Sequence, residues 1–162
     1  MRFFVTGDVP RQKLINALIL MFLGYTALLC VSNALMYFSR MSLYPDSVIM
    51  YYAGSEADFM PPKSYDSLLE ITHFHLFAMG MLILTLTHLM LMTNLPTRLK
   101  IWLSAIIYLS ALADELAGWL IRFIHPGFAY FKIASFLTLE IALIVLVIVI
   151  SLSLIQSRYR QH

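Results

Sequence analysis

A short stretch of the sequence, LLEITHFHLF (residues 68–77), carries an acid and two histidines where a polar segment gives way to a long apolar one. Glu70 and His73 are three residues apart, so on a helix they share one face. Glu-x-x-His is the helical spacing of di-iron carboxylate bundles, which need two such motifs and further acids. A single motif therefore predicts at most a mononuclear site of mixed nitrogen and oxygen ligands, suited to Fe, Mn or Zn.

The second histidine, His75, points in a different direction from the first. Two residues turn about 200° on a helix, so His75 is rotated by about 160° from His73. The pair cannot chelate one ion on a regular helix, and the sequence leaves open which ring faces inward. Glu70 also has a purely structural explanation, because with Ser67 or Asp66 as N-cap it would stand near the third helical position of a capping box.

Composition and hydropathy place these residues in a membrane protein. The chain of 162 residues is 60% hydrophobic and 12% charged, whereas a soluble domain is about 25% charged. The apolar residues form four runs of about 23 to 26 residues, each long enough to cross ~30 Å of hydrocarbon. The predicted transmembrane helices are 14–38, 68–93, 101–123 and 131–155.

The connections between these helices predict the topology. Residues 94–98 and 124–128 are short turns, so the helices they join must run in opposite directions. We expect an all-α integral membrane protein, an antiparallel up-down bundle of four transmembrane helices that forms a single membrane domain over residues 1–162. The remaining connection is the outer loop 39–67, whose Tyr, Phe and Met residues suit the membrane interface or a partner subunit.

The distribution of basic residues predicts the orientation. Seven of the eleven Lys and Arg residues would lie on the side of the two termini, which places both termini in the cytoplasm, as in a bacterial-type inner membrane. The net charge of +2 gives no reason to expect a nucleic acid as partner. The single cysteine, Cys30, excludes a disulfide-exchange enzyme, which needs pairs of cysteines.

Polar residues from all four helices fall at a similar depth in the outer half of the membrane. Counted from the outer helix ends, His73, His75 and Asn33 lie at about 8–11 Å, and Asp114 and Glu140 at about 12–14 Å. An acid that faces lipid costs roughly 2.5–3.5 kcal/mol, so these groups should face the bundle interior and form one site. The predicted metal ligands are Glu70, His73, His75, Asp114 and Glu140.

Asp114 has an acidic neighbour, Glu115. Because adjacent residues on a helix point in different directions, we expect only one of these two carboxylates to point squarely inward. The sequence alone does not identify which one.

Haem and quinol are the alternatives to a bound metal ion. The cofactor-binding candidates are His73, His75 and His88, and His73 and His88 are separated by ~22 Å along the helix, as in two-haem cytochromes. The fourth helix has no histidine, so a haem b would need ligands shared with a partner or a second copy. A quinol needs an acid or base beside an apolar slot, which a histidine and an acid at this depth would supply.

The leading hypothesis is a membrane subunit of a redox or respiratory-type complex, with a metal, haem or quinol site in the outer leaflet. Such a chain would be a non-catalytic or electron-transfer subunit rather than a stand-alone enzyme. Other subunits would dock on the outer loop 39–67, and a homo-oligomer is also compatible. Two alternatives stay open: a structural anchor without a site, and a proton or metal-ion transporter, although the inner half offers only His88 as a relay. No motif is specific enough to assign a family.

Overall fold

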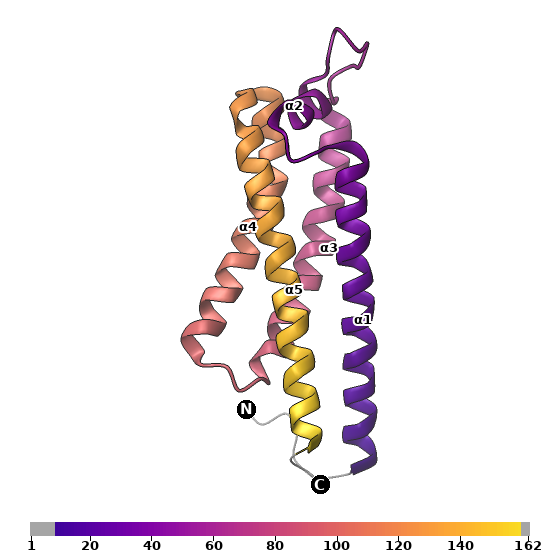
Figure 1. Ribbon diagram of the computed structural model, residues 1–162, viewed down its shortest axis with the longest axis vertical. Helices are drawn as coiled ribbons and strands as arrows, with labels where there is room; N and C mark the ends of the chain where they lie inside the picture. Colours follow the sequence, from indigo (N-terminus) through magenta and orange to yellow (C-terminus); the bar gives the residue numbers. More distant parts are fainter. Residues whose placement is uncertain (1–8, 160–162) are drawn as a thin grey trace.

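The computed structural model describes residues 9–159, and the side chains of residues 13–156. Four long helices make up most of it: α1 (Val9–Arg40), α3 (Tyr65–Leu91), α4 (Thr97–Phe123) and α5 (Ala129–Tyr159). Each contains a stretch long and apolar enough to cross a membrane, which confirms the expected fold of four transmembrane helices. Consecutive long helices run in opposite directions along the bundle (Figure 1).

Two short helices, α2 (Pro45–Ala53) and η1 (Pro126–Phe128), lie at one end of the bundle, which we call the α2 end. The expected loop 39–67 thus contains a helix. Proline suits its first position because its fixed φ matches the helix and its missing N–H needs no partner there. Val48 and Tyr52 lie four residues apart on the face that is buried against the bundle. Both described ends of the chain lie at the opposite end (Figure 1).

Helix α3 begins earlier than the apolar run suggests. Its N-cap is Ser64, whose side-chain oxygen accepts a hydrogen bond of 3.1 Å from the backbone N–H of Ser67. This cap satisfies one of the unpaired N–H groups of the first turn. Glu70 therefore lies in the second turn, and the expected capping box with Ser67 or Asp66 as N-cap is wrong.

The buried apolar residues form two clusters. The larger one lies between the four long helices and includes Leu23, Ile83, Leu86, Ile107 and Leu146. The smaller one holds α2 against the bundle and consists of Val48, Tyr52, Leu68, Ile121 and Ala129. Among the long helices, α4 packs most extensively on α5, and α1 packs mainly on α5.

Candidate functional site

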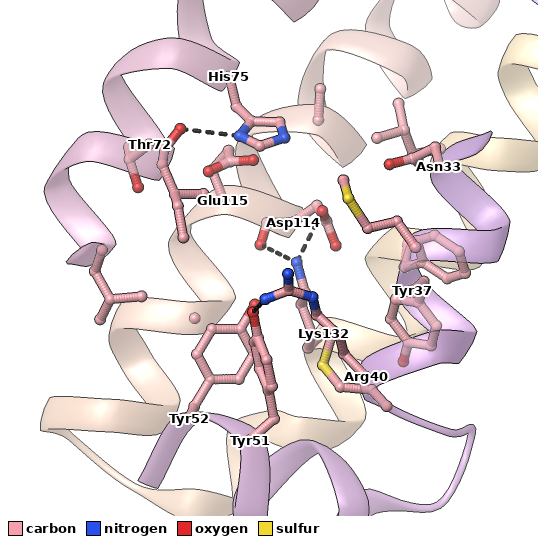
Figure 2. A pocket seen from close by; sticks show the side chains of 18 of the residues that line it. Asn33, Tyr37, Arg40, Tyr51, Tyr52, Thr72, His75, Asp114, Glu115 and Lys132 are labelled. Atoms are coloured by element: carbon pink, nitrogen blue, oxygen red, sulfur yellow. Dashed lines mark hydrogen bonds and ion pairs between the residues drawn. The ribbon is translucent and has the colours of Figure 1, made fainter. Parts of the chain in front are cut away.

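A pocket with a volume of about 280 Å³ lies at the α2 end of the bundle. The four long helices, α2 and the segment before α3 all contribute side chains to its lining (Figure 2). Its apolar wall includes Met36, Met79, Ala111, Phe136 and Leu139. Its polar lining is Asn33, Tyr37, Arg40, Tyr51, Tyr52, Lys63, Thr72, His75, Asp114, Glu115 and Lys132.

An ion pair between α4 and α5 occupies the middle of the polar lining (Figure 2). Lys132 Nζ lies 2.9 Å from Oδ2 of Asp114 and donates a hydrogen bond of 3.0 Å to the backbone carbonyl of the same residue. Ser135 Oγ lies 3.4 Å from the other carboxylate oxygen, Oδ1. Only 7% of Lys132 is exposed. Since a buried charge without its partner is strongly destabilising, this pair fixes the position of α5 on α4.

The second acid, Glu115, faces a different neighbouring helix from Asp114. Adjacent residues are separated by about 100° on a helix, and α4 has neighbours on both sides. Asp114 therefore meets α5, and Glu115 faces α3, where it interacts with Thr72 and His75. Both carboxyl groups line the pocket, so the expectation that only one would point inward is wrong. Thr72 is itself fixed to α4, because its hydroxyl accepts a hydrogen bond of 2.9 Å from Trp119 Nε1.

The protonation of the His75 ring follows from its contact with its own helix. Nδ1 lies 2.9 Å from the backbone carbonyl of Ile71. A carbonyl oxygen can only accept, so Nδ1 carries the hydrogen, and in the neutral ring Nε2 is an acceptor. His75 can therefore accept a hydrogen bond at Nε2, beside the carboxyl group of Glu115.

Tyr52 brings α2 to the pocket. Its ring packs where α4 has Gly118, since a Cβ atom added to that glycine would lie 2.8 Å from Cε1 of Tyr52. The Lys132 ammonium lies 5.9 Å from the ring centroid. Burial raises the pKa of Tyr52, and the smaller opposing effect of Lys132 does not cancel this shift. The hydroxyl therefore stays protonated at neutral pH and can donate a hydrogen bond.

Helix α1 reaches the site through contacts with α5. Asn33 Nδ2 donates a hydrogen bond to Oε1 of Glu140. One turn further along, the Tyr37 ring stacks on Phe136, with centroids 3.8 Å apart and planes 9° from parallel. Glu140 thus contacts a residue of the pocket lining, although its own side chain does not line the pocket.

Residues 42–161 match the family Aq_1264_TM, described as a transmembrane helical domain. The chain belongs to this family. The matched residues include all of α2, α3, α4 and α5, whereas α1, with Asn33, Tyr37 and Arg40, precedes them. No curated protein and no solved structure matches the chain. Family membership agrees with the four apolar helices and makes this an integral membrane protein.

The pocket brings together only part of the set of residues predicted from the sequence. His75 and Asp114 line it, and Glu140 lies beside it. Glu70 and His73 are exposed on α3 and do not line it. The rotation of about 160° between the two histidines explains this outcome, because a helix that turns His75 inward turns His73 outward.

The five predicted metal ligands are therefore not assembled into one site. Among the described residues, no group of three or more His, Cys, Asp or Glu side chains could hold a metal ion. His88 is exposed, like His73. A haem bound to either ring would have to lie on the outside of this bundle, against another protein.

Three important pocket residues were not among the predicted ligands. Lys132 lies inside the fourth apolar run, and its long side chain reaches Asp114 on the preceding helix. A lysine in an apolar run could have been recognised from the sequence as one member of an ion pair. Glu115 was recognised only as an alternative to Asp114. Tyr52 had no signal of its own, because α2 is too short to show helical periodicity.

Proposed function

We propose that the protein is a membrane subunit of a redox complex and that the pocket at the α2 end binds the head group of a quinol. The observation that carries this proposal is the adjacency of Glu115 and His75 in a pocket that is also lined by apolar side chains. A quinol ring needs proton acceptors for its hydroxyl groups and apolar contacts for its faces. A volume of about 280 Å³ suits a single ring.

The residues of the pocket would have separate roles in quinol oxidation. One quinol hydroxyl would donate to Nε2 of His75, which takes its proton, and the Glu115 carboxylate would stabilise the imidazolium. The second hydroxyl would lie near Tyr52 and Lys132, which would donate to its oxygen, and it would give its proton to the Asp114 carboxylate, which also lines the pocket. The two electrons would leave one at a time to an electron carrier in a partner subunit.

The α2 end would face the outside of the membrane and both termini the cytoplasm. Among the basic residues that the structure describes, four lie at the α2 end and five lie towards the other end, namely Arg11, Lys13, Arg98, Lys100 and Arg158. This excess favours the proposed orientation. Protons taken from quinol at the α2 end would then leave to the outer side. A bacterial-type inner membrane remains the proposed location.

The loop that follows α2 would dock a partner subunit. Residues 54–60 form a tight turn in which the backbones of Ser55 and Met60 are paired by hydrogen bonds of 3.0 and 2.9 Å. Gly54 has φ 83°, and a Cβ atom there would lie 2.6 Å from the carbonyl oxygen of Met60. The turn projects from the α2 end (Figure 1) and holds Phe59 94% exposed, at φ 53°. A bulky side chain in this backbone conformation is uncommon, so a role in contact with another protein is a reasonable assignment.

The quinol proposal can be tested with the fluorescence of Trp119. The chain has two tryptophans, and Trp102→Phe leaves Trp119, which hydrogen-bonds Thr72 at the pocket, as the only reporter. A short-chain quinone, reduced to its quinol and kept reduced without oxygen, should quench the fluorescence of this variant in lipid nanodiscs with saturation. Glu115→Gln should weaken binding by about tenfold, because the hydrogen bond between the quinol and His75 then loses the assistance of a neighbouring charge. Hydrogen bonds that involve a charged group are worth about 1.5–3 kcal/mol, and neutral ones about 0.5–1.5 kcal/mol.

Glu70→Gln is the matched control, since Glu70 lies on α3 but is exposed and does not line the pocket. This variant should bind the quinol as the parent does. Quenching that rises linearly with quinol concentration, or that is equal in both acid variants, would indicate partition into lipid and would reject the quinol site.

A structural anchor is the second candidate, and one observation favours it. Every buried side-chain nitrogen or oxygen among the described residues has a hydrogen-bond partner within the chain, so the polar groups can serve packing alone. In that case Glu115→Gln would lower the yield of the assembled complex without affecting quinol binding. A transporter is less well supported, because the larger buried cluster toward the end opposite α2 is apolar.

A further inference from the structure

Three basic residues at the α2 end have no carboxylate partner within the described chain. Arg40 and Lys63 line the pocket at the ends of membrane spans, a place that we call its mouth, and Arg122 bonds the backbone carbonyl of Lys63. Arg40 ends α1, Lys63 precedes α3, and Arg122 lies in the last turn of α4. In the part of the chain that the structure describes, the only Lys or Arg paired with an acid is Lys132, which binds Asp114 deeper in the pocket. Arg40 and Lys63 therefore bring two unpaired positive charges to the mouth.

Tyr51 connects two of these cations. The Arg40 guanidinium lies 3.3 Å from the Tyr51 hydroxyl, and Figure 2 shows this contact beside the Asp114–Lys132 pair. The Lys63 ammonium lies 4.4 Å from the centroid of the same ring, in a cation–π contact. A single aromatic ring thus holds both cations at one place. Since the hydroxyl contact uses one of the five N–H groups of arginine, others can bind a ligand.

The backbone on either side of Lys63 is also fixed. Its N–H donates a hydrogen bond of 3.0 Å to the carbonyl of Tyr52, and its own carbonyl accepts one of 2.9 Å from Arg122 Nε. The location of Lys63 is therefore determined by the folded backbone of the α2 end, and not only by its flexible side chain. The Arg122 contact also brings a third cation next to the backbone of Lys63.

The height of these cations in the membrane indicates what they bind. The apolar spans end at Arg40 and Phe123 and begin at Tyr65, so each cation lies within two residues of a span end. Beside them, Tyr65, Trp119 and Phe123 form an aromatic cluster with ring centroids 5.3 to 6.4 Å apart. Such rings mark the level of the lipid head groups, where the phosphates of phospholipids lie.

We propose that Arg40 and Lys63, bridged by Tyr51, bind the phosphate of an anionic phospholipid at the mouth of the pocket. Arginine suits this role because its planar group can donate two hydrogen bonds to one phosphate. Basic residues at the level of the head groups also attract anionic lipids electrostatically. The site uses other residues than the proposed quinol site, so either proposal can fail alone.

Lipid binding to the purified full-length protein can be measured by native mass spectrometry. The probes are a phosphatidylglycerol and a phosphatidylcholine with the same acyl chains. The wild type should retain phosphatidylglycerol preferentially, and Arg40→Gln/Lys63→Gln should bind it about tenfold less tightly. Arg40→Lys/Lys63→Arg keeps both charges and should retain much of the preference, which separates loss of charge from misfolding.

The matched control is Lys13→Gln/Arg98→Gln, which removes two exposed cations from the opposite end of the bundle. It should bind phosphatidylglycerol at the mouth as the wild type does. Equal retention of the two lipids by the wild type, or equal losses in the test and control variants, would overturn the proposal.

Inorganic phosphate distinguishes a lipid from a soluble ligand. Phosphate is added at about 10 mM, a concentration that would occupy an anion site of millimolar affinity. If the bound phosphatidylglycerol stays in place, the lipid assignment is supported. If phosphate displaces the lipid and raises the melting temperature of the wild type but not of Arg40→Gln/Lys63→Gln, the anion chemistry holds and the lipid source is overturned.

Discussion

Lys132 binds Asp114 twice, once through the carboxylate at 2.9 Å and once through the backbone carbonyl at 3.0 Å. The two side chains are 8% and 14% exposed. The first contact balances the charge, and the second occupies another of the three ammonium hydrogens. The double contact joins α4 to α5 at the level of the pocket, so the geometry of the polar lining depends on it.

Removal of one partner of this pair should destabilise the protein strongly. Asp114→Leu leaves the Lys132 ammonium buried without its counter-charge and should cost about 3–5 kcal/mol in the free energy of unfolding. The double variant Asp114→Leu/Lys132→Met should recover a large part of that loss, because neither charge then remains. Unfolding by SDS in mixed micelles, followed by far-UV circular dichroism, measures both. Additive effects of the two substitutions would contradict a direct pair.

Gly118 should be sensitive to the addition of a single methyl group. The Cβ atom of Gly118→Ala would lie 2.8 Å from the Tyr52 ring, so α2 must shift, at a cost of about 1–3 kcal/mol. Proteolysis of the segment between α1 and α3 should become faster. Gly80→Ala is the control, because no atom lies within 4 Å of its added Cβ, and alanine favours a helix over glycine by up to about 1 kcal/mol. Equal proteolysis of the two variants would show that Tyr52 does not hold α2 in place.

The fold was predictable from the sequence because membrane helices are identified by hydropathy averaged over long stretches of the chain. Four apolar runs of about 23–26 residues identify membrane helices by length alone, and short turns determine their alternation. The helix ends were less predictable: α1 and α5 continue beyond their apolar runs, and Ser64 rather than Ser67 caps α3. A cap depends on local hydrogen bonds, which hydropathy does not report.

The sequence predicted how deep in the membrane the site lies, but not which residues form it. Residues on one helix have known relative angles, so the opposition of His73 and His75 followed from the sequence. The absolute rotation of α3 did not, because it depends on packing with α4 through Trp119 and Thr72. The same limit explains why Glu115 could not be placed, since its partners lie on a different helix from those of Asp114.

The exposed aromatic side chain of Phe59 should be needed for association with a partner subunit. Phe59→Ser removes the apolar group at the tip of the turn but leaves the Ser55–Met60 backbone pairing intact. Complexes extracted from membranes in a mild detergent should fall to the size of the free chain, as measured by light scattering after gel filtration. Tyr44→Ser, which removes another exposed ring of the same connection, should keep the original size. An unchanged size in both variants would exclude Phe59 from an interface.

Tyr52 should make the protein sensitive to alkaline pH. Burial raises its pKa in the folded state, above the value of about 10 for an unfolded chain. The folded state then holds the proton more tightly than the unfolded state. Its contribution to stability is complete below pH ~10 and is lost as the pH rises through the folded pKa. Tyr52→Phe should flatten the decline in unfolding free energy above pH ~10, by up to about 1.4 kcal/mol per pH unit. Tyr44→Phe, at an exposed position, should decline as the wild type does; an equally steep decline in Tyr52→Phe would assign the alkaline sensitivity to other groups.

The hydrogen bond from Asn33 to Glu140 should contribute measurably to the docking of α1. It joins α1 to α5 within the membrane span, where interhelical hydrogen bonds average about 0.6 kcal/mol and reach about 1.7. A double-mutant cycle with Asn33→Ala and Glu140→Ala, measured by SDS unfolding, should give a coupling energy in this range. Ser32→Ala is the control, because the Ser32 hydroxyl is exposed and bonds only the Leu29 carbonyl of its own helix. It should be close to neutral and uncoupled from Glu140. A coupling energy near zero for Asn33 would mean that α1 is held by the stacking of Tyr37 on Phe136 and by apolar contacts, and Tyr37→Ala would then be the more damaging substitution.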